Sequence, residues 1–445
     1  MKTVARIVLL LSPCWLAAAG FKNYEVGARA TALGGAFVAG FSDPFSIFHN
    51  PAAITGLEGT QFQLGASYTS RRYAFSTGDF GGLTLESERV SPLLPEFAVT
   101  RRLNRFLWAG LGLHVPTVHQ VGWPVELFNP LVYDARRITR KTWTLTPTLA
   151  FRLSERFSIG ASLGVNFASG EMIKHLNFDM LIVQLSSGRI MDAQDFILTL
   201  RDCRKTYLSF GLGIRWKWSE RLFFGFSAEG GLTRKYAVGN IVFREPDTPF
   251  ADINLRLDEA FIDSPAQKAW ATFNDVATFK WGLAWKANER LVVEVDAYLA
   301  IWEMFDTVAV HFEKPISISA LHLSELEGDF TWKNPVSLRI GAEYRASDRI
   351  DARLGFFTEP SPVPDEQFSA SFPFTNQWGL TAGVGWRVKN LTLSAAYRFQ
   401  RVAARRVTTG NADLELIGLN DIAFAARNEH LVSIGLGYAI GGGGR

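Results

Sequence analysis

The sequence predicts an all-β protein, a transmembrane antiparallel β-barrel of about 14 strands with an N-terminal hatch inside its lumen. Three observations lead to this prediction. An export leader opens the chain, a Gly- and Ala-rich segment follows it, and most of the remaining sequence alternates apolar and polar residues. The connections between these segments alternate between short and long. Outer-membrane barrels have this pattern, with short periplasmic turns and long outer loops.

Residues 1–19 have the features of a cleaved signal peptide. Lys2 and Arg6 form a positive n-region, and an apolar stretch and a small-residue cleavage zone follow them. We expect cleavage within residues 18–20. Cys14 leaves lipidation as the less favoured alternative, because the residue before it is a proline rather than a small residue.

Charge and composition exclude several classes of protein. The formal net charge of +3 becomes +1 once Lys2 and Arg6 are removed (3 − 2 = 1), and no Lys/Arg block is present, so we expect no nucleic-acid partner. Only Cys203 remains after cleavage, which leaves no possibility of an intrachain disulfide. The histidines are scattered, and we predict neither a metal site nor a cofactor.

Residues 20–58 are predicted to fold as the hatch. Glycines in this segment permit tight turns and close backbone approach, and the segment ends in a turn signal. The candidate gate residues are Gly34, Gly35, Asn50, Pro51 and Ala52. Phe45 and Phe48 suit a pocket for an apolar ligand better than they suit a polar pore. An ordinary soluble N-terminal segment is the alternative.

Residues 59–440 are predicted to form the barrel. In residues 377–388, for example, one face is apolar while the other carries Gly, Thr and Arg. The predicted strands begin near Gln61, Pro95, Phe106, Lys141, Phe157, Lys205, Arg221, Ala277, Leu291, Pro335, Arg349, Gln377, Leu391 and Asn428.

The first and last strands should pair with each other. An open sheet edge cannot stay unpaired in lipid, so residues 61–70 and 428–440 are expected to close the barrel. Some strands, such as the one that begins at Phe157, look longer than the ~9–11 residues that cross a bilayer and should extend beyond the outer surface. Residues 441–445 form a Gly-rich tail.

The long connections are rich in apolar residues, which favours ligand capture at the outer surface. The candidate ligand-binding residues there are Trp123, Phe128, Leu131, Leu181, Leu185 and Phe196, together with Phe45 and Phe48 of the hatch. The alternative is that these loops only pack on one another as a lid. Arg136 and Arg215, expected near the outer half of the barrel, are candidates for binding a ligand carboxylate.

The third strand is a candidate for an opening in the wall. Glycine weakens a strand ladder and proline removes a hydrogen-bond donor, and this strand contains Gly110 and Gly112 and then Pro116. The alternative is that the two glycines only make room for the hatch.

No catalytic centre is predicted. Residues 160–164 match G-x-S-x-G, but they lie inside an alternating strand rather than at a strand-to-helix elbow. The leading alternative of another class is a barrel enzyme acting on lipids, with Ser162 as its best nucleophile candidate. A polar-solute porin is the second alternative.

Three stretches carry a resemblance to a known family. Residues 27–52 (GARATALGGAFVAGFSDPFSIFHNPA), 361–386 (SPVPDEQFSASFPFTNQWGLTAGVGW) and 430–440 (HLVSIGLGYAI) resemble the long-chain fatty acid transporter (FadL/TodX) family of outer-membrane proteins. The order and count of strands agree as well. One difference is the end of the chain, where family members usually finish on an aromatic residue and this sequence continues past Tyr438 to a Gly-rich tail.

The resemblance implies a fourteen-stranded barrel with an internal hatch that contains the Asn-Pro-Ala element. It implies passive uptake of long-chain fatty acids or aromatic hydrocarbons, with capture at outer loops, a pocket above the hatch and lateral exit beside a kinked third strand. It also implies a monomer in the bacterial outer membrane, inserted by the barrel-assembly machinery among lipids that include lipopolysaccharide.

Overall fold

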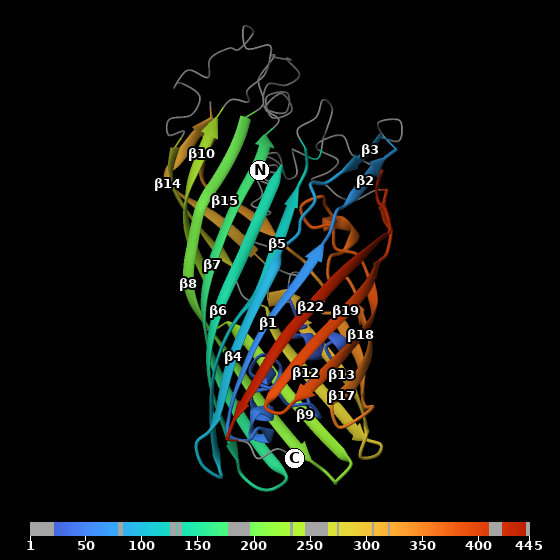
Figure 1. Ribbon diagram of the computed structural model, residues 1–445. Coiled ribbons are helices and arrows are strands. Elements are labelled where there is room, and N and C mark those ends of the chain that lie inside the picture. Colours follow the sequence, from blue (N-terminus) through green and yellow to red (C-terminus); the bar gives the residue numbers. More distant parts are fainter. Residues whose placement is uncertain are drawn as a thin grey trace.

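The protein is a tall barrel of tilted strands with short helices inside its lower half (Figure 1). The computed structural model describes residues 22–78, 83–124, 131, 136–176, 196–231, 235–244, 266–273, 276–304, 307–318, 321–408 and 421–441. The predicted signal peptide and almost all of the Gly-rich tail lie outside these residues.

The first elements are helical. They are α2 (Ala28–Ala32), α3 (Ser46–His49) and the 3-10 helix η2 (Pro51–Gly56). The first half of the strands comprises β1 (Thr60–Ser70), β2 (Ala74–Thr77), β3 (Leu83–Glu86), β4 (Leu93–Arg102), β5 (Leu107–Gly122), β6 (Arg137–Arg152), β7 (Phe157–Leu176), β8 (Phe196–Lys217), β9 (Leu222–Gly231), β10 (Lys235–Arg244) and β11 (Ala266–Phe273).

The second half comprises β12 (Ala277–Lys286), β13 (Leu291–Ile301), β14 (Thr307–Ile318), β15 (Leu321–Asp329), β16 (Val336–Arg345), β17 (Ile350–Glu359), β18 (Gln377–Val388), β19 (Leu391–Val402), β20 (Arg405–Val407), β21 (Ile422–Phe424) and β22 (Arg427–Ile440), with the short 3-10 helices η4 (Trp302–Met304) and η5 (Asp365–Gln367). None of the helices in the described residues is long and apolar enough to cross a membrane.

The described residues form fourteen wall strands, as predicted. Eighteen segments make up the main sheet, and four wall strands are each interrupted once, so that β9 continues as β10, β11 as β12, β13 as β14 and β15 as β16. The lower segments pair with one another, β9 with β12 and β12 with β13, while the upper segments pair β10 with β11 and β11 with β14. A second sheet of β20, β21, β2 and β3 lies at the upper end.

The barrel closes through its first and last wall strands, which confirms the expected pairing. β1 and β22 are antiparallel with Thr60 opposite Ile440 and Ser70 opposite His430. On its other side β1 pairs with β4. Every wall strand therefore has two neighbours, which leaves no open edge in the part that crosses the bilayer.

Most predicted strand starts agree with the structure. Three wall strands begin earlier than predicted. β8 begins at Phe196 and not near Lys205, and the wall strands β11–β12 and β15–β16 begin at Ala266 and Leu321 rather than near Ala277 and Pro335. A bulge around Asp202, which has a φ of 57°, interrupts the alternation of apolar and polar residues in β8. β7 and β8 have 20 and 22 residues, so this side of the barrel extends above the bilayer as expected.

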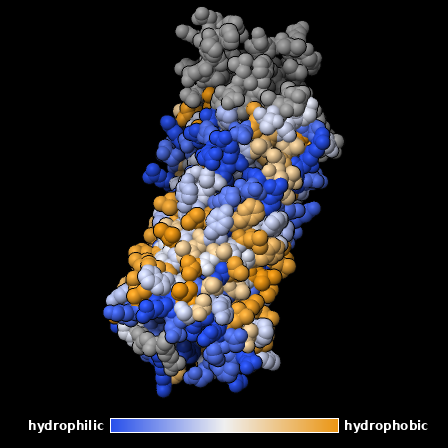
Figure 2. All heavy atoms as spheres, turned by 45° about the vertical axis from the view of Figure 1, so that its right-hand side comes forward, coloured by the Kyte–Doolittle hydropathy of each residue, from blue (hydrophilic) through white to orange (hydrophobic). Residues whose placement is uncertain are grey.

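Side chains alternate between lipid and lumen along the strands. In β18, Leu380 is 53% exposed on the outer face, while Thr381 is 3% exposed and faces inward. Figure 2 shows the resulting apolar belt across the middle of one face of the barrel, with hydrophilic side chains above and below it. Such a belt allows the barrel to sit in a bilayer.

Residues 22–57 lie inside the lower barrel, and we use the name hatch for this segment because of that position. Their apolar side chains are almost entirely buried, among them Leu33, Phe37, Phe45 and Ile54. α2 contacts β18, β19 and β22, whereas η2 contacts β6, β7 and β8. These helices therefore touch wall strands on several sides of the lumen.

Candidate functional site

Two glycines shape the turn after α2. Gly34 and Gly35 have φ values of 65° and 82°, a region that side-chain-bearing residues rarely adopt. A Cβ at Gly34 would also lie 2.9 Å from the carbonyl oxygen of Phe356 in the wall. The turn can therefore lie directly against β17 only because both residues are glycine.

Asn50 connects three parts of the structure. Its Nδ2 donates to the carbonyls of Val38 at 2.7 Å and of Ile214 in β8 at 2.9 Å, while its Oδ1 accepts from the Ala52 amide at 3.1 Å. Pro51 occupies the first turn of η2, where its missing amide hydrogen costs nothing. The Asn-Pro-Ala element thus caps η2 and joins the hatch to the wall.

A buried ion-pair cluster holds the start of the hatch. Glu25 accepts hydrogen bonds from Arg339 in β16 and Arg398 in β19, and Arg339 also pairs with Glu359 at 3.1 Å. Burial acts to raise the pKa of the Glu25 carboxyl, but the two guanidinium groups outweigh it and hold the pKa below its usual range. We call Glu25, Arg339 and Arg398 the hatch latch.

The middle of the hatch is bound through its backbone. Glu294 and Asp296 in β13 accept hydrogen bonds from the four consecutive amides of residues 37–40, at 2.6 to 3.2 Å. Arg215 donates to the carbonyls of Ala39 and Gly40. Acidic and basic side chains of the wall therefore form hydrogen bonds with the backbone amides and carbonyls of residues 37–40.

Arg215 does not lie in the outer half of the barrel, where it was expected as a carboxylate ligand. It lies two residues before the end of β8, at the end of the barrel where the short turns are. Its guanidinium donates hydrogen bonds to the hatch. Since β8 runs downward from Phe196, position 215 falls near its lower end.

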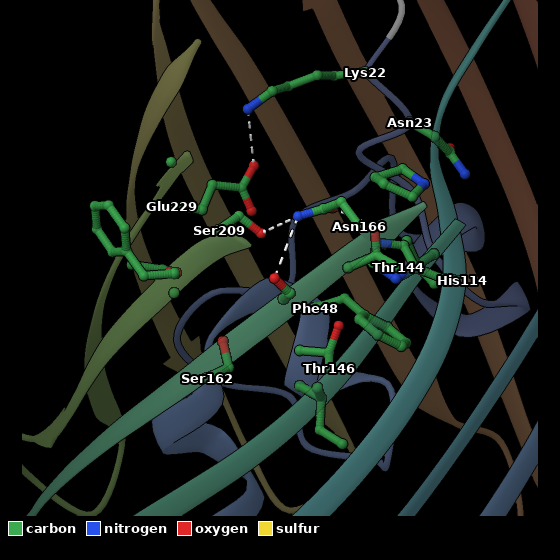
Figure 3. A pocket seen from close by; sticks show the side chains of 18 of the residues that line it. Lys22, Asn23, Phe48, His114, Thr144, Thr146, Ser162, Asn166, Ser209 and Glu229 are labelled. Carbon is green, nitrogen blue, oxygen red and sulfur yellow. Dashed lines mark hydrogen bonds and ion pairs between the residues drawn. The ribbon is translucent and has the colours of Figure 1, made fainter. Parts of the chain in front are cut away.

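A cavity lies beside the hatch (Figure 3). The volume open to the centres of water molecules is about 110 Å³. Its apolar lining includes Phe48, and its polar lining includes Lys22, Asn166, Ser209, Glu229 and Lys280. The lining is therefore mixed, in contrast to the apolar pocket expected from the hatch phenylalanines.

Two ammonium groups face one carboxylate in this cavity. Glu229 pairs with Lys22 of the hatch at 3.3 Å and with Lys280 of β12 at 3.1 Å. Lys22 also donates to Thr278 at 2.6 Å. The cluster has one positive charge in excess, which suits a negatively charged ligand group.

Asn166 organises the polar wall of the cavity. It accepts from Thr144 at 2.6 Å and donates to Ser209 at 2.9 Å (Figure 3). The Phe48 ring packs against the His114 ring, with centroids 4.0 Å apart and the ring planes tilted by 35°. The Thr146 hydroxyl also lines the cavity and is buried without a hydrogen-bond partner among the described residues.

The third wall strand, β5, has an irregular register where an opening was expected. Its pairing with β6 shifts between His114 and Thr117, and its pairing with β4 ends at Leu113. The Asn23 amide donates to the carbonyl of Pro116 at 2.8 Å, inside this bulge. The start of the hatch and the irregular part of the wall are thus in direct contact.

Gly110 and Gly112 face the hatch. A Cβ on Gly112 would overlap the Phe48 ring, and one on Gly110 would lie 2.8 Å from Ile47 Cδ1. The structure therefore supports the alternative explanation, that these glycines make room for the hatch. Their role in an opening of the wall stays a prediction.

The other ligand-binding candidates fall into separate places. Phe45 is 1% exposed and packs in the hatch core rather than on the cavity, because its ring lies over Gly27. Trp123 and Leu131 are buried near the upper end, where Trp123 contacts Phe75. Arg136 binds Glu88 at 3.0 Å and the Trp123 carbonyl.

Some candidates cannot be placed. Phe128, Leu181 and Leu185 lie outside the described residues, as does the side chain of Phe196, whose backbone begins β8. Of the predicted ligand-binding side chains that the structure describes, only Phe48 lines the cavity beside the hatch.

Sequence reasoning missed the polar residues of the cavity. Lys22, Glu229 and Lys280 are far apart in the chain, and each looks like an ordinary charge on an alternating strand or after a leader. One signal was available, since Glu229 and Lys280 occupy inward positions of strands whose other inward residues are neutral, apart from Lys286 at the lower end of β12.

The structure places Ser162 within β7, as the sixth of its 20 residues, where it lines the cavity. A nucleophile elbow requires a sharp strand-to-helix turn, which this position does not provide. Within the described part of the chain, no group of three His, Cys, Asp or Glu residues is arranged to hold a metal ion.

Comparison with known proteins relates the whole chain to outer-membrane transporters. Residues 10–438 match the model of the family described as outer membrane protein transport protein (OMPP1/FadL/TodX). A curated outer membrane protein of Neisseria meningitidis serogroup B is 23% identical over 475 residues, with 97% of each chain covered.

Solved structures share the fold. A FadL homologue of Pseudomonas aeruginosa superposes with a TM-score of 0.76 at 20% identity, covering 95% of this chain and 100% of that chain. The toluene transporter TodX of P. putida gives 0.70 at 14% identity, covering 94% and 99%. With a family match over nearly its full length and a closed barrel of fourteen wall strands, this chain belongs to the OMPP1/FadL/TodX family of outer membrane transport proteins.

Proposed function

We propose that the protein takes up hydrophobic compounds passively across the bacterial outer membrane, and that its cargo is a long-chain fatty acid or an aromatic hydrocarbon. Family membership supports transport, and the relatives include a toluene transporter. The observation that carries the proposal is a hatch held across the lower lumen with a cavity against it. This arrangement would obstruct free diffusion of polar solutes.

Burial of apolar surface supplies the affinity in this proposal. Each CH₂ transferred from water is worth about 0.8 kcal/mol, so a long acyl chain binds without strong polar contacts. The apolar long connections favour first capture at the outer surface. No covalent chemistry is required.

The mixed cavity favours a cargo with one polar end. Phe48 offers an apolar surface, whereas Lys22 and Lys280 offer ammonium groups that share one carboxylate. A fatty acid places an acyl chain and a carboxylate in such surroundings at once. We therefore favour a carboxylate-bearing cargo over a pure hydrocarbon.

Lateral exit at β5 is the proposed release route. The β4–β5 pairing stops at Leu113, and above it Leu94, Val115 and Val118 close the wall by apolar packing. Apolar contacts separate at lower cost than backbone hydrogen bonds when the alternative environment is lipid. Displacement of Asn23 from Pro116 would free this part of β5.

Uptake assays test the proposed cargo. Cells that lack their own transporter of this family would be given radiolabelled oleate or toluene, with and without the protein. We expect faster accumulation of oleate, and a smaller gain or none for toluene. Equal rates with and without the protein for both compounds would reject hydrophobic uptake.

A disulfide between hatch and wall tests the release step. An ideal Cβ on Gly435 of β22 would lie 3.7 Å from the Cβ of Ala28, within the about 3.5–4.5 Å of natural disulfides. In a Cys203→Ser background, Ala28→Cys with Gly435→Cys should reduce uptake at least tenfold when oxidised. Reduction should restore it.

The matched control crosslinks wall to wall. A Cβ on Gly437 would lie 3.6 Å from that of Thr392, so Thr392→Cys with Gly437→Cys closes a similar bond without touching the hatch. This variant should transport normally in both redox states. Full uptake by the oxidised hatch variant would reject a moving hatch while leaving hydrophobic uptake itself intact.

A further inference from the structure

The short turns at the lower end of the barrel repeat one sequence pattern. Residues 152–156 (RLSER), 217–221 (KWSER), 286–290 (KANER) and 345–349 (RASDR) each have a basic residue, a Ser or Asn, an acidic residue and an arginine at the same spacing. Residues 101–105 and 387–390 are the other two short turns, and both are basic as well. We call these six turns the periplasmic rim.

The rim carries a large surplus of positive charge. It contains thirteen basic and four acidic residues, a surplus of nine, whereas the whole chain has a surplus of only three. The rest of the protein is therefore net negative. Figure 2 shows hydrophilic side chains at this end, directly below the apolar belt.

The turn geometry fixes the position of one arginine in each repeat. The Ser or Asn side chain accepts two backbone amides, for example Ser154 from Arg156 at 3.2 Å and from Phe157 at 3.1 Å. The same pair of bonds recurs at Ser219, Asn288 and Ser347. As a result Arg156, Arg221, Arg290 and Arg349 all stand immediately before an ascending wall strand and are exposed.

Basic residues also stand beside one another around the rim. The carbonyl of Arg156 accepts the amide of Lys217 at 2.7 Å, and the carbonyl of Arg290 accepts that of Arg345 at 2.8 Å. Like charges side by side on neighbouring strands destabilise a sheet. An anion from outside the protein would remove this cost.

Among the described residues, the rim carboxylates form no ion pair within 4.0 Å with the four arginines. Glu220 binds Lys217 at 2.6 Å and Glu289 binds Lys286 at 2.9 Å, so these carboxylates are engaged by the lysines. Among the described residues, Arg156, Arg221, Arg290 and Arg349 form no ion pair within 4.0 Å. Their charges are thus available to a partner.

Aromatic side chains place the rim at the boundary of the hydrocarbon layer. Trp218, Trp285, Tyr344 and Trp386 are 45–55% exposed, and each is adjacent in sequence to a basic rim residue. Aromatic girdles mark the membrane interface of outer-membrane barrels. The neighbouring arginines and lysines consequently stand at the level of the lipid headgroups.

We propose that the periplasmic rim binds the phosphate headgroups of anionic glycerophospholipids in the inner leaflet of the outer membrane. The guanidinium group matches phosphate oxygens with paired hydrogen bonds, and the acyl chains would lie along the apolar belt above. The basic residues surround the barrel rather than gather on one side. An annulus of lipid fits such a ring, whereas a docked protein would need a patch.

Spin-label measurement of boundary lipid tests the proposal. The full chain would be reconstituted in phosphatidylcholine containing 20% phosphatidylglycerol, a composition chosen for the assay, and the motionally restricted fraction of each spin-labelled lipid measured. We expect about two- to threefold preference for phosphatidylglycerol, since several interfacial cations each attract anionic lipid. In about 0.5 M NaCl the preference should fall, because screening shortens the reach of charges to a few ångströms.

Variants separate the rim from other charges. Arg156→Gln, Arg221→Gln, Arg290→Gln and Arg349→Gln together should bring the preference close to one, while the four corresponding Arg→Lys changes should keep most of it. The matched control, Arg72→Gln, Arg89→Gln, Arg201→Gln and Arg204→Gln, removes four exposed charges at the upper end and should keep it too.

The outcomes are decisive either way. Heat-modifiable migration on a gel verifies that each variant folds as a barrel. No preference in the unmodified protein, or an unchanged preference in the folded Arg→Gln rim variant, would overturn the proposal. Both results would also fit a rim that docks an acidic protein instead of lipid.

Discussion

At the scale of single residues, Asn50 makes three hydrogen bonds that connect the hatch with itself and with the wall. Asn50→Ala removes three hydrogen bonds and leaves the carbonyls of Val38 and Ile214 without this donor. We expect the hatch to lose about 2–4 kcal/mol of local stability, at about 1 kcal/mol or more for each bond. Hydrogen exchange of hatch amides would accelerate accordingly.

Asn104→Ala is the control for this substitution. Asn104 caps an exposed short turn through the amides of Phe106 and Leu107, and among the described residues its side chain forms no hydrogen bond with residues 22–57. Its loss should leave hatch exchange unchanged. Equal exchange in the Asn50 variant and the unmodified protein would show that the Asn-Pro-Ala element does not stabilise the hatch.

His49 makes the hatch sensitive to acid. Burial, assisted by Lys280, lowers its pKa to about 4 from an ordinary value of 6.5. The unfolded segment then binds the proton more readily, so the stability contributed by neutral His49 is complete above pH 6.5 and is lost as pH falls toward 4. The total loss is roughly 3 kcal/mol.

Hydrogen exchange at several pH values, corrected for its intrinsic pH dependence, measures this effect. His49→Gln keeps a neutral donor for the Val26 carbonyl, which lies 3.0 Å from Nε2 in the native hatch. The variant should lose less protection between pH 6.5 and pH 4 than the unmodified protein. Identical pH profiles for the two would contradict a role for His49.

At the scale of elements, the hatch latch joins the first hatch residues to two wall strands. Glu25→Gln leaves Arg398 without a carboxylate and Arg339 with only Glu359. Breaking a buried pair by removing one partner costs about 3–5 kcal/mol. We expect the hatch to become susceptible to limited proteolysis under conditions in which the barrel stays folded.

Glu58→Gln provides the contrast. Glu58 pairs with Arg102 at the rim, and its side chain is 54% exposed. Exposed pairs contribute about 0–1 kcal/mol, so the proteolysis pattern should stay the same. If both variants behaved alike, the latch would have no special part in holding the hatch.

Gly112 in β5 has no side chain, and this leaves room for the Phe48 ring of α3. Gly112→Ala would push its Cβ into the Phe48 ring, and such overpacking typically costs about 1–3 kcal/mol. Phe48→Ala should relieve the overlap, so the two changes together should destabilise less than the sum of the single changes. A thermal-unfolding double-mutant cycle measures the difference, and strict additivity would contradict the contact.

Elements differ in how far the sequence predicts them. Period-two alternation predicts β18 and its neighbours because each wall strand faces lipid on one side and the lumen on the other. The start of β8 was predicted wrongly because the bulge at Asp202 shifts the alternation of apolar and polar residues. The hatch latch was not predictable, since 314 residues separate Glu25 from Arg339 and only closure of the barrel brings them together.

At the scale of the whole molecule, the strand count and closure followed from alternation and from the requirement that no edge stay open in lipid. The mixed cavity did not follow, because inward-facing residues of different strands meet only at a register that the sequence does not show. Phe48 was found because an apolar ring in a Gly-rich hatch is conspicuous, whereas Lys22 and Glu229 resemble ordinary charges.

Ion conductance in planar lipid bilayers tests the central claim most directly, which is that this barrel is stoppered by its own N-terminal segment. The intact protein should conduct almost nothing, and a variant without residues 22–57 that still folds as a barrel should give large open-channel steps. Large steady conductance from the intact protein, unchanged by removal of this segment, would contradict the account.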